Sequence, residues 1–163
     1  MDNPSNQYLR NAVMTATPEQ LHLMLYDGAI RFTKQGIEGI RTKKWEDAFN
    51  GFSRAQKIIL EMVNALNYDV NRELCTRMAG LYNFIYRKLV EASVERDPKP
   101  AEEALGVIEY QRQTWVMLMD RLRQERADPA PAAAPSSAAV AAASVSGPEP
   151  TEEAIYGSLC VEG

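Results

Sequence analysis

The chemistry open to this sequence is limited first by its histidines, because His22 is the only one. His22 stands three positions after Glu19, and Glu-x-x-His on a helix is the metal-ligand spacing of di-iron carboxylate bundles. Such bundles use two of these motifs and carboxylates from two further helices, whereas one motif is present here. A metal-binding bundle built on Glu19 and His22 is therefore an alternative, and we predict instead that His22 lies on the surface or in a groove.

Other catalytic arrangements are also unsupported by the residue types. Nucleophilic catalysis requires a general base beside a Ser, Cys or Lys, and a second candidate histidine is lacking. Gly28, Gly36 and Gly39 do not follow a predicted strand, so they do not form a phosphate-binding loop. We predict a protein that is not an enzyme and that uses no cofactor.

Apolar residues outnumber the positions that one shared interior would bury. A bundle helix buries a stripe roughly a hundred degrees wide, but further rows run beside these stripes. The rows contain Ile58, Leu60, Cys75, Ala79, Tyr82, Tyr86, Val90, Val94, Val107, Tyr110 and Met117. One explanation is a self-associating structural bundle with a wide core or a dimer interface. The other is a set of exposed grooves that receive amphipathic segments of another protein.

We predict partner contact at Tyr8, Ile58, Tyr82, Tyr86, Val90, Val107, Tyr110 and Met117. Tyrosine suits such a surface because its ring binds apolar groups while its hydroxyl stays hydrated. Tyr8 belongs to an N-terminal arm that either covers a groove until the partner arrives or fastens the arm to the body.

Four segments have helical periodicity, at residues 18–41, 44–66, 71–96 and 100–126. Thr17 and Gln20 fit a capping box, and Pro18 suits the first helical position. Short connections between long helices predict an all-α fold, an antiparallel up-down-up-down four-helix bundle. Its predicted core contains Leu21, Leu25, Phe32, Phe52, Ile59, Leu81, Ile85, Trp115, Leu118 and Leu122.

Composition divides the chain into three parts. Residues 1–16 form a flexible arm, 17–126 the helical domain, and 127–163 an acidic tail rich in Ala, Pro and Ser. Residues 127–150 lack large apolar side chains, which predicts a disordered linker. Residues 151–163 regain Ile155, Tyr156 and Leu159, and are either a short amphipathic docking segment or a frayed terminus.

Charge and cysteine usage exclude several classes of protein. The net charge is -4, and no Lys or Arg follows Arg126, so the negative charge belongs to the tail. A nearly neutral body argues against nucleic acid as partner. No segment resembles a signal peptide or a membrane span, so we expect a cytoplasmic protein without membrane insertion. Cys75 is predicted to pack inside, and Cys160 to be an exposed thiol.

Several segments resemble the flagellin export chaperones, the FliS family. The first, Thr17 to Phe32, reads T-P-E-Q-L-H-L-M-L-Y-D-G-A-I-R-F, and Leu81 to Ser93 repeats its Leu-Tyr-polar opening and later Arg. Tyr8, the second-helix segment Ala55 to Met62 and the late Trp115 follow the family's order. The resemblance covers roughly residues 5–122. Asn83 and Ser93 depart from the Asp and Asn that are usual in the family.

The resemblance implies a function that the residue patterns alone do not. A FliS-like protein would bind the C-terminal segment of flagellin in the cytosol and prevent its premature polymerisation. It would then deliver flagellin to a component of the flagellar export apparatus. Tyr8 matches the family's N-terminal tyrosine.

Overall fold

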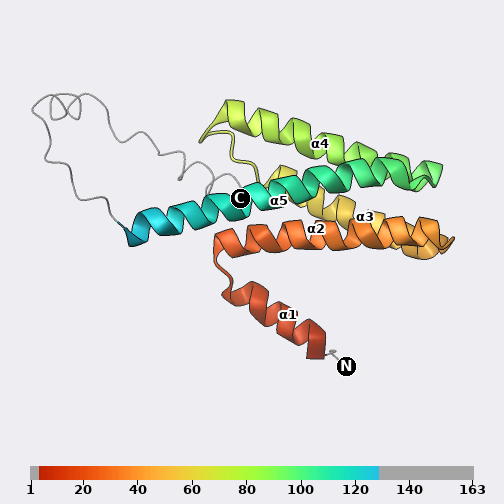
Figure 1. Ribbon diagram of the computed structural model, residues 1–163, viewed down its shortest axis with the longest axis horizontal. Coiled ribbons are helices and arrows are strands. Elements are labelled where there is room, and N and C mark those ends of the chain that lie inside the picture. The colour runs from red at the N-terminus through yellow and green to blue at the C-terminus, as the bar shows by residue number, and fades with distance from the viewer. Residues whose placement is uncertain (1–3, 129–163) are drawn as a thin grey trace, which may run out of the picture.

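The computed structural model describes residues 4–128, which form five helices joined by short connections (Figure 1). The helices are α1 (Pro4–Thr15), α2 (Pro18–Arg41), α3 (Trp45–Asn64), α4 (Arg72–Glu95) and α5 (Pro98–Ala127). No strand occurs in the described part of the chain. The predicted all-α fold is confirmed, and the bounds of the four long helices agree with prediction to within about two residues.

The additional helix, α1, corrects the prediction of an arm without regular structure. All twelve residues of α1 are helical, yet none of them is buried. Pro4 occupies the first position, where its missing amide hydrogen costs nothing. Figure 1 shows α1 diverging from the other helices below α2. Short-range preference alone therefore forms this helix, and its apolar side chains remain available for contacts.

The starts of three long helices follow from capping by local side chains. Gln20 N donates to Thr17 Oγ1 at 3.2 Å, and Thr17 N donates to Gln20 Oε1 at 2.9 Å. Asn71 caps α4 by accepting from the amide of Leu74, and Asp97 caps α5 by accepting from Lys99. These bonds satisfy amides that lack partners within a helix, so the sequence determines these boundaries locally.

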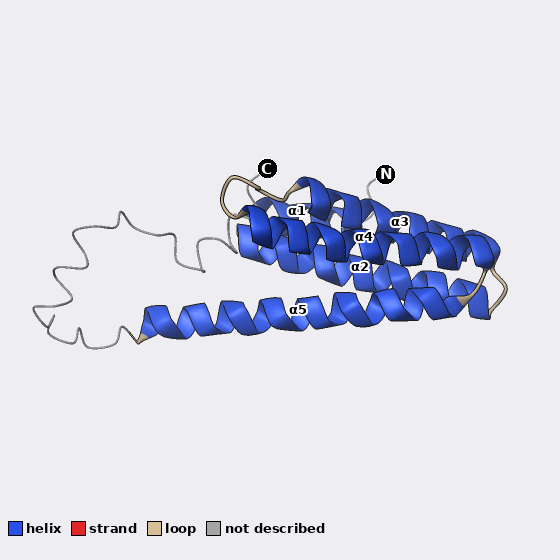
Figure 2. Cartoon of the chain, turned by 90° about the horizontal axis from the view of Figure 1, so that it is seen from above, coloured by secondary structure: helices blue, strands red, loops and turns tan. Residues whose placement is uncertain are grey.

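Helices α2–α5 pack in a ring in which α2 contacts α3, α3 contacts α4, α4 contacts α5, and α5 contacts α2. Figure 2 shows these helices lying lengthwise beside one another, with α5 continuing past the body. Among the predicted core residues, those fully enclosed are Phe52, Ile59, Ile85 and Trp115. The others, Leu21, Leu25, Phe32, Leu81, Leu118 and Leu122, are half-buried.

The buried face of α2 is rotated by one residue from the predicted stripe. His22, Tyr26, Ala29 and Thr33 are enclosed, in place of the residues immediately before them. Close approach to α3 explains the rotation, since a Cβ at Gly51 would lie 2.5 Å from the backbone nitrogen of Gly36. The α2 residues one position before the buried ones, such as Gly28 and Phe32, thus lie directly against α3.

Several predictions concern residues outside the described range. The predicted linker, 127–150, lies outside the described range except for Ala127, the last residue of α5, and Asp128. The docking segment at 151–163 and the exposed thiol of Cys160 lie entirely beyond residue 128. Within residues 4–128, the helices are all too short or too polar to cross a membrane. Cys75 is buried as predicted, with its Sγ donating to the carbonyl oxygen of Asn67 at 3.2 Å.

Candidate protein-binding surface

The four long helices meet along seams, and helical geometry assigns each side chain to a seam. In α3 the buried residues are Ala48, Gly51, Phe52, Ala55, Ile59 and Met62. Ile58, one position before Ile59, lies beside Gly28 of α2. Because successive residues are rotated by about 100°, the residues one position after the buried ones turn toward α4.

The seam between α2 and α5 is polar. Three ion pairs cross it, Lys34–Glu109 at 2.8 Å, Arg41–Glu102 at 2.6 Å and Arg112–Asp27 at 2.5 Å. The members of these pairs are substantially exposed, so each pair contributes little stability. Their geometry nevertheless fixes how α5 lies along α2, and they place charges along the rim of this seam.

The seam between α3 and α4 is apolar. On α3, the row after the buried face begins with Trp45, 41% exposed, and Phe49, 63% exposed, and it ends near Leu60, 43% exposed. Lys88 of α4 forms an ion pair with Glu103 of α5, so the side of α4 that carries Lys88 faces α5. The opposite side of α4, which carries Tyr86, therefore faces α3.

We define the α3–α4 strip as Trp45, Phe49, Leu60, Tyr86, Val90 and Val94. Val94 is 76% exposed, while Tyr86 and Val90 are half-buried. Within residues 4–128, no ion pair joins α3 to α4. The side chain of Arg96 lies 4.7 Å from the centre of the Trp45 ring and closes one end of the strip. An exposed apolar row of this length is typical of a protein interaction site.

His22 is a core residue, so the prediction of a surface or groove position is wrong. It is 2% exposed and packs edge-on against Tyr26 and Trp115, with ring centroids 4.7 and 4.3 Å away. Neither ring nitrogen has a hydrogen-bond partner in the described chain. Burial lowers the pKa of His22 to about 4, because the enclosed ring disfavours charge.

The metal-binding alternative has no supporting cluster. Within residues 4–128, no group of three or more His, Cys, Asp or Glu side chains could hold a metal ion. Glu19 is engaged through its backbone, since its carbonyl oxygen accepts from Trp115 Nε1 at 3.2 Å. This bond ties the start of α2 to α5.

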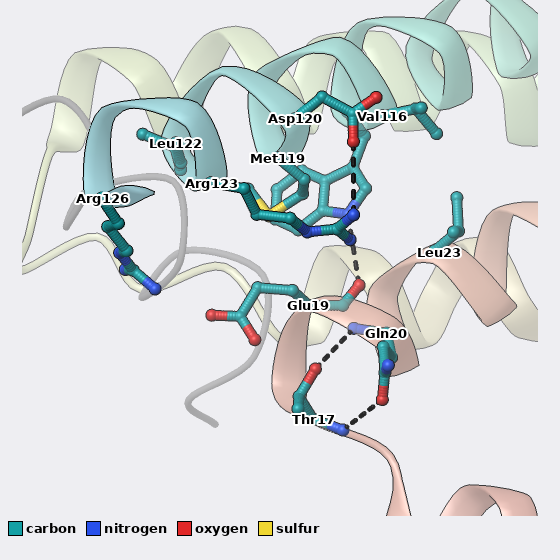
Figure 3. A pocket seen from close by; sticks show the side chains of 11 residues that line it. Thr17, Glu19, Gln20, Leu23, Val116, Met119, Asp120, Leu122, Arg123 and Arg126 are labelled. Carbon is teal, nitrogen blue, oxygen red and sulfur yellow. Dashed lines mark hydrogen bonds and ion pairs between the residues drawn. The ribbon is translucent and has the colours of Figure 1, made fainter. Parts of the chain in front are cut away.

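A cleft of about 380 Å³ opens where α5 passes the start of α2 (Figure 3). Figure 3 shows the Thr17–Gln20 cap on one wall and the Asp120–Arg123 pair on the other. Leu23, Val116, Met119 and Leu122 also line it. Its mixed lining contrasts with the mainly apolar surface of the α3–α4 strip.

The predicted partner residues do not form one surface. Tyr86 and Val90 lie on the strip, while Ile58 is in the α2–α3 seam. Val107 is half-buried on the α4 side of α5, and Met117 lines a second cleft between α2 and α5. Tyr110 on α5 and Tyr8 on α1 are 68% and 78% exposed.

Tyr82 does not belong to an exposed surface, and the expectation of exposure is wrong for it. It is 1% exposed, and its hydroxyl lies 3.3 Å from that of Tyr26 within the core. The predicted partner contacts also left out Trp45 and Phe49, which are 41% and 63% exposed. Ser53 and Gln56 continue the same helical row, and these polar residues were the available signal that the row is not enclosed.

The fold and the surface define an all-helical protein with an exposed apolar face. A family model described as "Flagellar protein FliS" matches residues 1–122, and the chain belongs to this family. It is therefore a member of a chaperone family and not an enzyme, as the resemblance implied.

The curated relatives carry the name flagellar secretion chaperone FliS. That of Bacillus subtilis (strain 168) is 34% identical over 128 residues, which span 77% of this chain and 93% of the relative. That of Campylobacter jejuni is 27% identical over 110 residues, 68% of this chain and 86% of the relative. That of Salmonella typhimurium is 28% identical over 114 residues, 66% of this chain and 80% of the relative.

Proposed function

We propose that this chain is a cytoplasmic export chaperone that binds the C-terminal segment of flagellin. In this proposal, α2–α5 act as an antiparallel up-down-up-down four-helix bundle spanning the 17–126 domain. Apolar grooves between its helices hold flagellin until transfer to a component of the flagellar export apparatus. Nucleic acid and membrane insertion have no part in the proposed activity.

The observation that carries the proposal is the α3–α4 strip. Trp45 and Leu60 are 15 positions apart on α3, so the strip runs for about 22 Å, enough for about four turns of an amphipathic helix. Phe49 and Val94 are exposed in the described structure, and covering them with flagellin would remove apolar surface from water. Binding in this mode needs only an apolar stripe on the incoming helix.

The mechanism follows from competition for the same apolar groups. Flagellin segments that polymerise through their apolar faces cannot also pair with one another while those faces contact the chaperone. Ordering an extended segment costs several kcal/mol, roughly 2–5, which a large apolar contact must offset. Ile58, Val107, Tyr110 and Met117 remain predicted contacts for parts of flagellin that extend beyond the strip.

The N-terminal arm is proposed as a displaceable element. α1 carries Tyr8, Leu9, Val13 and Met14 with exposed fractions between 42% and 81%. These side chains could cover an apolar groove when flagellin is absent, or fasten the arm to the body. In the described conformation no residue of α1 is buried.

The direct test compares binding of full-length flagellin with flagellin that lacks its C-terminal segment. We expect the wild-type chain to co-purify with the first and not with the second. Phe49→Ser should then weaken binding by about 10–100-fold, because a buried aromatic side chain contributes about 1.5–3 kcal/mol. Calorimetric titration gives the dissociation constants.

Met117→Ser is the matched control, since Met117 is 64% exposed and Phe49 63%. It lies in the α2–α5 seam and is a predicted contact only for parts of flagellin that extend beyond the strip, so we expect a loss well below that of Phe49→Ser. Equal losses would contradict a site centred on the strip. A tight dimer that is indifferent to flagellin in sedimentation experiments would favour the self-associating structural bundle.

A further inference from the structure

The acidic segment 151–163 has the chemistry to occupy the α3–α4 strip of its own chain. It contains Glu152, Glu153 and Glu162 without a basic residue, together with Ile155, Tyr156 and Leu159. The spacing of these three apolar residues, i, i+1 and i+4, would place them on one side of a helix. The segment follows the region matched by the family model, residues 1–122.

The strip has the complementary character. Lys57 comes one position after Gln56 on α3, and Arg87 one position after Tyr86 on α4. Arg72 lies about four turns before Tyr86 on the same side of α4. Within residues 4–128, none of these three basic side chains forms an ion pair. With Arg96 at the Trp45 end, four exposed basic side chains border the strip, against the exposed acidic residues Glu46 and Glu61.

The connection between the two is long enough. Figures 1 and 2 both show the end of α5 at the same end of the molecule as the α3–α4 connection. Residues 129–150 join α5 to the segment, and a chain of this length spans about 26 Å on average if it behaves as a coil. Its fully extended reach of roughly 75 Å exceeds the length of any of these helices. Covalent attachment then supplies a local concentration in the millimolar range.

We propose that segment 151–163 docks on the α3–α4 strip of its own chain, with its apolar residues on Phe49, Leu60 and Tyr86. Its glutamates lie toward Lys57 and Arg87. The segment therefore shields the strip from water and from other proteins. If the strip binds flagellin, as the proposed function holds, flagellin must displace the segment. This competition weakens the apparent affinity of the chain for flagellin.

The native thiol of Cys160 provides the test in the full-length chain. Gln56→Cys places a thiol on α3 within the strip, and Gln113→Cys places one on α5 in the α2–α5 cleft. Cys75 is buried and stays out of the reaction. Under mild oxidation at low protein concentration, we expect the disulfide to Cys160 to form roughly tenfold faster in Gln56→Cys than in Gln113→Cys. Peptide mapping by mass spectrometry measures both rates.

Two further variants separate docking from random collisions. Adding Ile155→Ser and Leu159→Ser, or Glu152→Lys and Glu153→Lys, to Gln56→Cys should reduce its rate to that of Gln113→Cys. Equal rates at the two positions, or a Gln56→Cys rate unaffected by these changes, would overturn the proposal. If circular dichroism shows that Gln56→Cys lowers the helix content, Ser53→Cys on the same row replaces it.

The same assay keeps this proposal distinct from flagellin binding. Selective cross-linking that decreases when the flagellin C-terminal segment is added supports both proposals. Selective cross-linking that is unchanged by a flagellin segment known to bind the chain supports docking and contradicts flagellin binding on the strip. Absence of selectivity with retained flagellin binding overturns docking alone.

Discussion

Acidification should destabilise this protein through His22. The imidazole is enclosed between Tyr26 and Trp115, and neither ring nitrogen has a hydrogen-bond partner in the described chain. Burial lowers its pKa from 6.5 to about 4. In the unfolded chain the ring is hydrated and takes up a proton near its ordinary pKa. Between these two values, protons bind to the unfolded chain and not to the folded protein.

The sign and the size follow from linkage. Above about pH 6.5 the ring is neutral in both states, so it contributes no pH dependence. As the pH falls, the unfolded state gains the proton first, and the free energy of unfolding decreases. The loss is about 1.4 kcal/mol at pH 5.5 and about 2.5 kcal/mol at pH 4.5, and it levels off at about 3.4 kcal/mol well below pH 4. Because His22 is 2% exposed, solvent screening does not reduce this effect much.

Urea unfolding followed by circular dichroism at pH 7.5, 5.5 and 4.5 measures this dependence. His22→Leu is the comparison, because leucine fills a similar volume and cannot take up a proton. Subtracting its pH profile removes the titration of the carboxylates that both proteins share. At pH 7.5 the variant should be equally stable or about 1–3 kcal/mol more stable, since two unsatisfied polar atoms are gone. Identical pH profiles for the two proteins would refute the reasoning.

Three other predictions concern packing, capping and the arm. Gly51→Ala should lower the free energy of unfolding by about 1–3 kcal/mol, because the new Cβ would meet the α2 backbone. Gly80→Ala should raise the free energy of unfolding by about 0.5–1 kcal/mol, because nothing lies within 4 Å of its Cβ. Thermal melts of the two variants check the sign of each change. Thr17→Ala should cost about 1 kcal/mol by removing the cap of α2, measured by urea unfolding, and an unchanged midpoint would contradict the capping role. Deleting residues 1–12 should increase the association rate of a flagellin C-terminal peptide in stopped-flow measurements if α1 covers the groove, and a slower or unaltered rate would exclude occlusion.

The helix boundaries were predictable because the groups that determine them are close in sequence. Thr17 and Gln20 form their two hydrogen bonds within one turn, and Asp97 caps α5 two residues ahead. The helix α1 was missed because a short segment without buried residues has no apolar stripe to reveal it. Its helical state depends on weak preferences that compete closely with an irregular conformation.

The assignment of rows to the interior was less predictable, because it depends on neighbouring helices. Leu21 and Leu25 are more apolar than His22 and Tyr26, yet the latter pair is enclosed. The contact between the glycine-containing faces of α2 and α3 sets the rotation of α2, and no property of α2 alone reports it. Tyr82 is enclosed for a related reason, since its hydroxyl meets that of Tyr26 across the core.

The three seams that join α2 and α5 to their neighbours explain why the α3–α4 strip can remain apolar and exposed. Glycine contacts hold α2 against α3, while ion pairs orient α5 along α2 and Lys88 bonds α4 to Glu103 of α5. Among the described residues, the relative positions of the four helices are therefore set without ion pairs across the α3–α4 seam. Side chains on the strip, such as Phe49, are then free to serve binding, and their replacement should change affinity more than stability. By the same argument, substitutions such as Gly51→Ala should change stability and leave the affinity of the remaining folded protein largely intact.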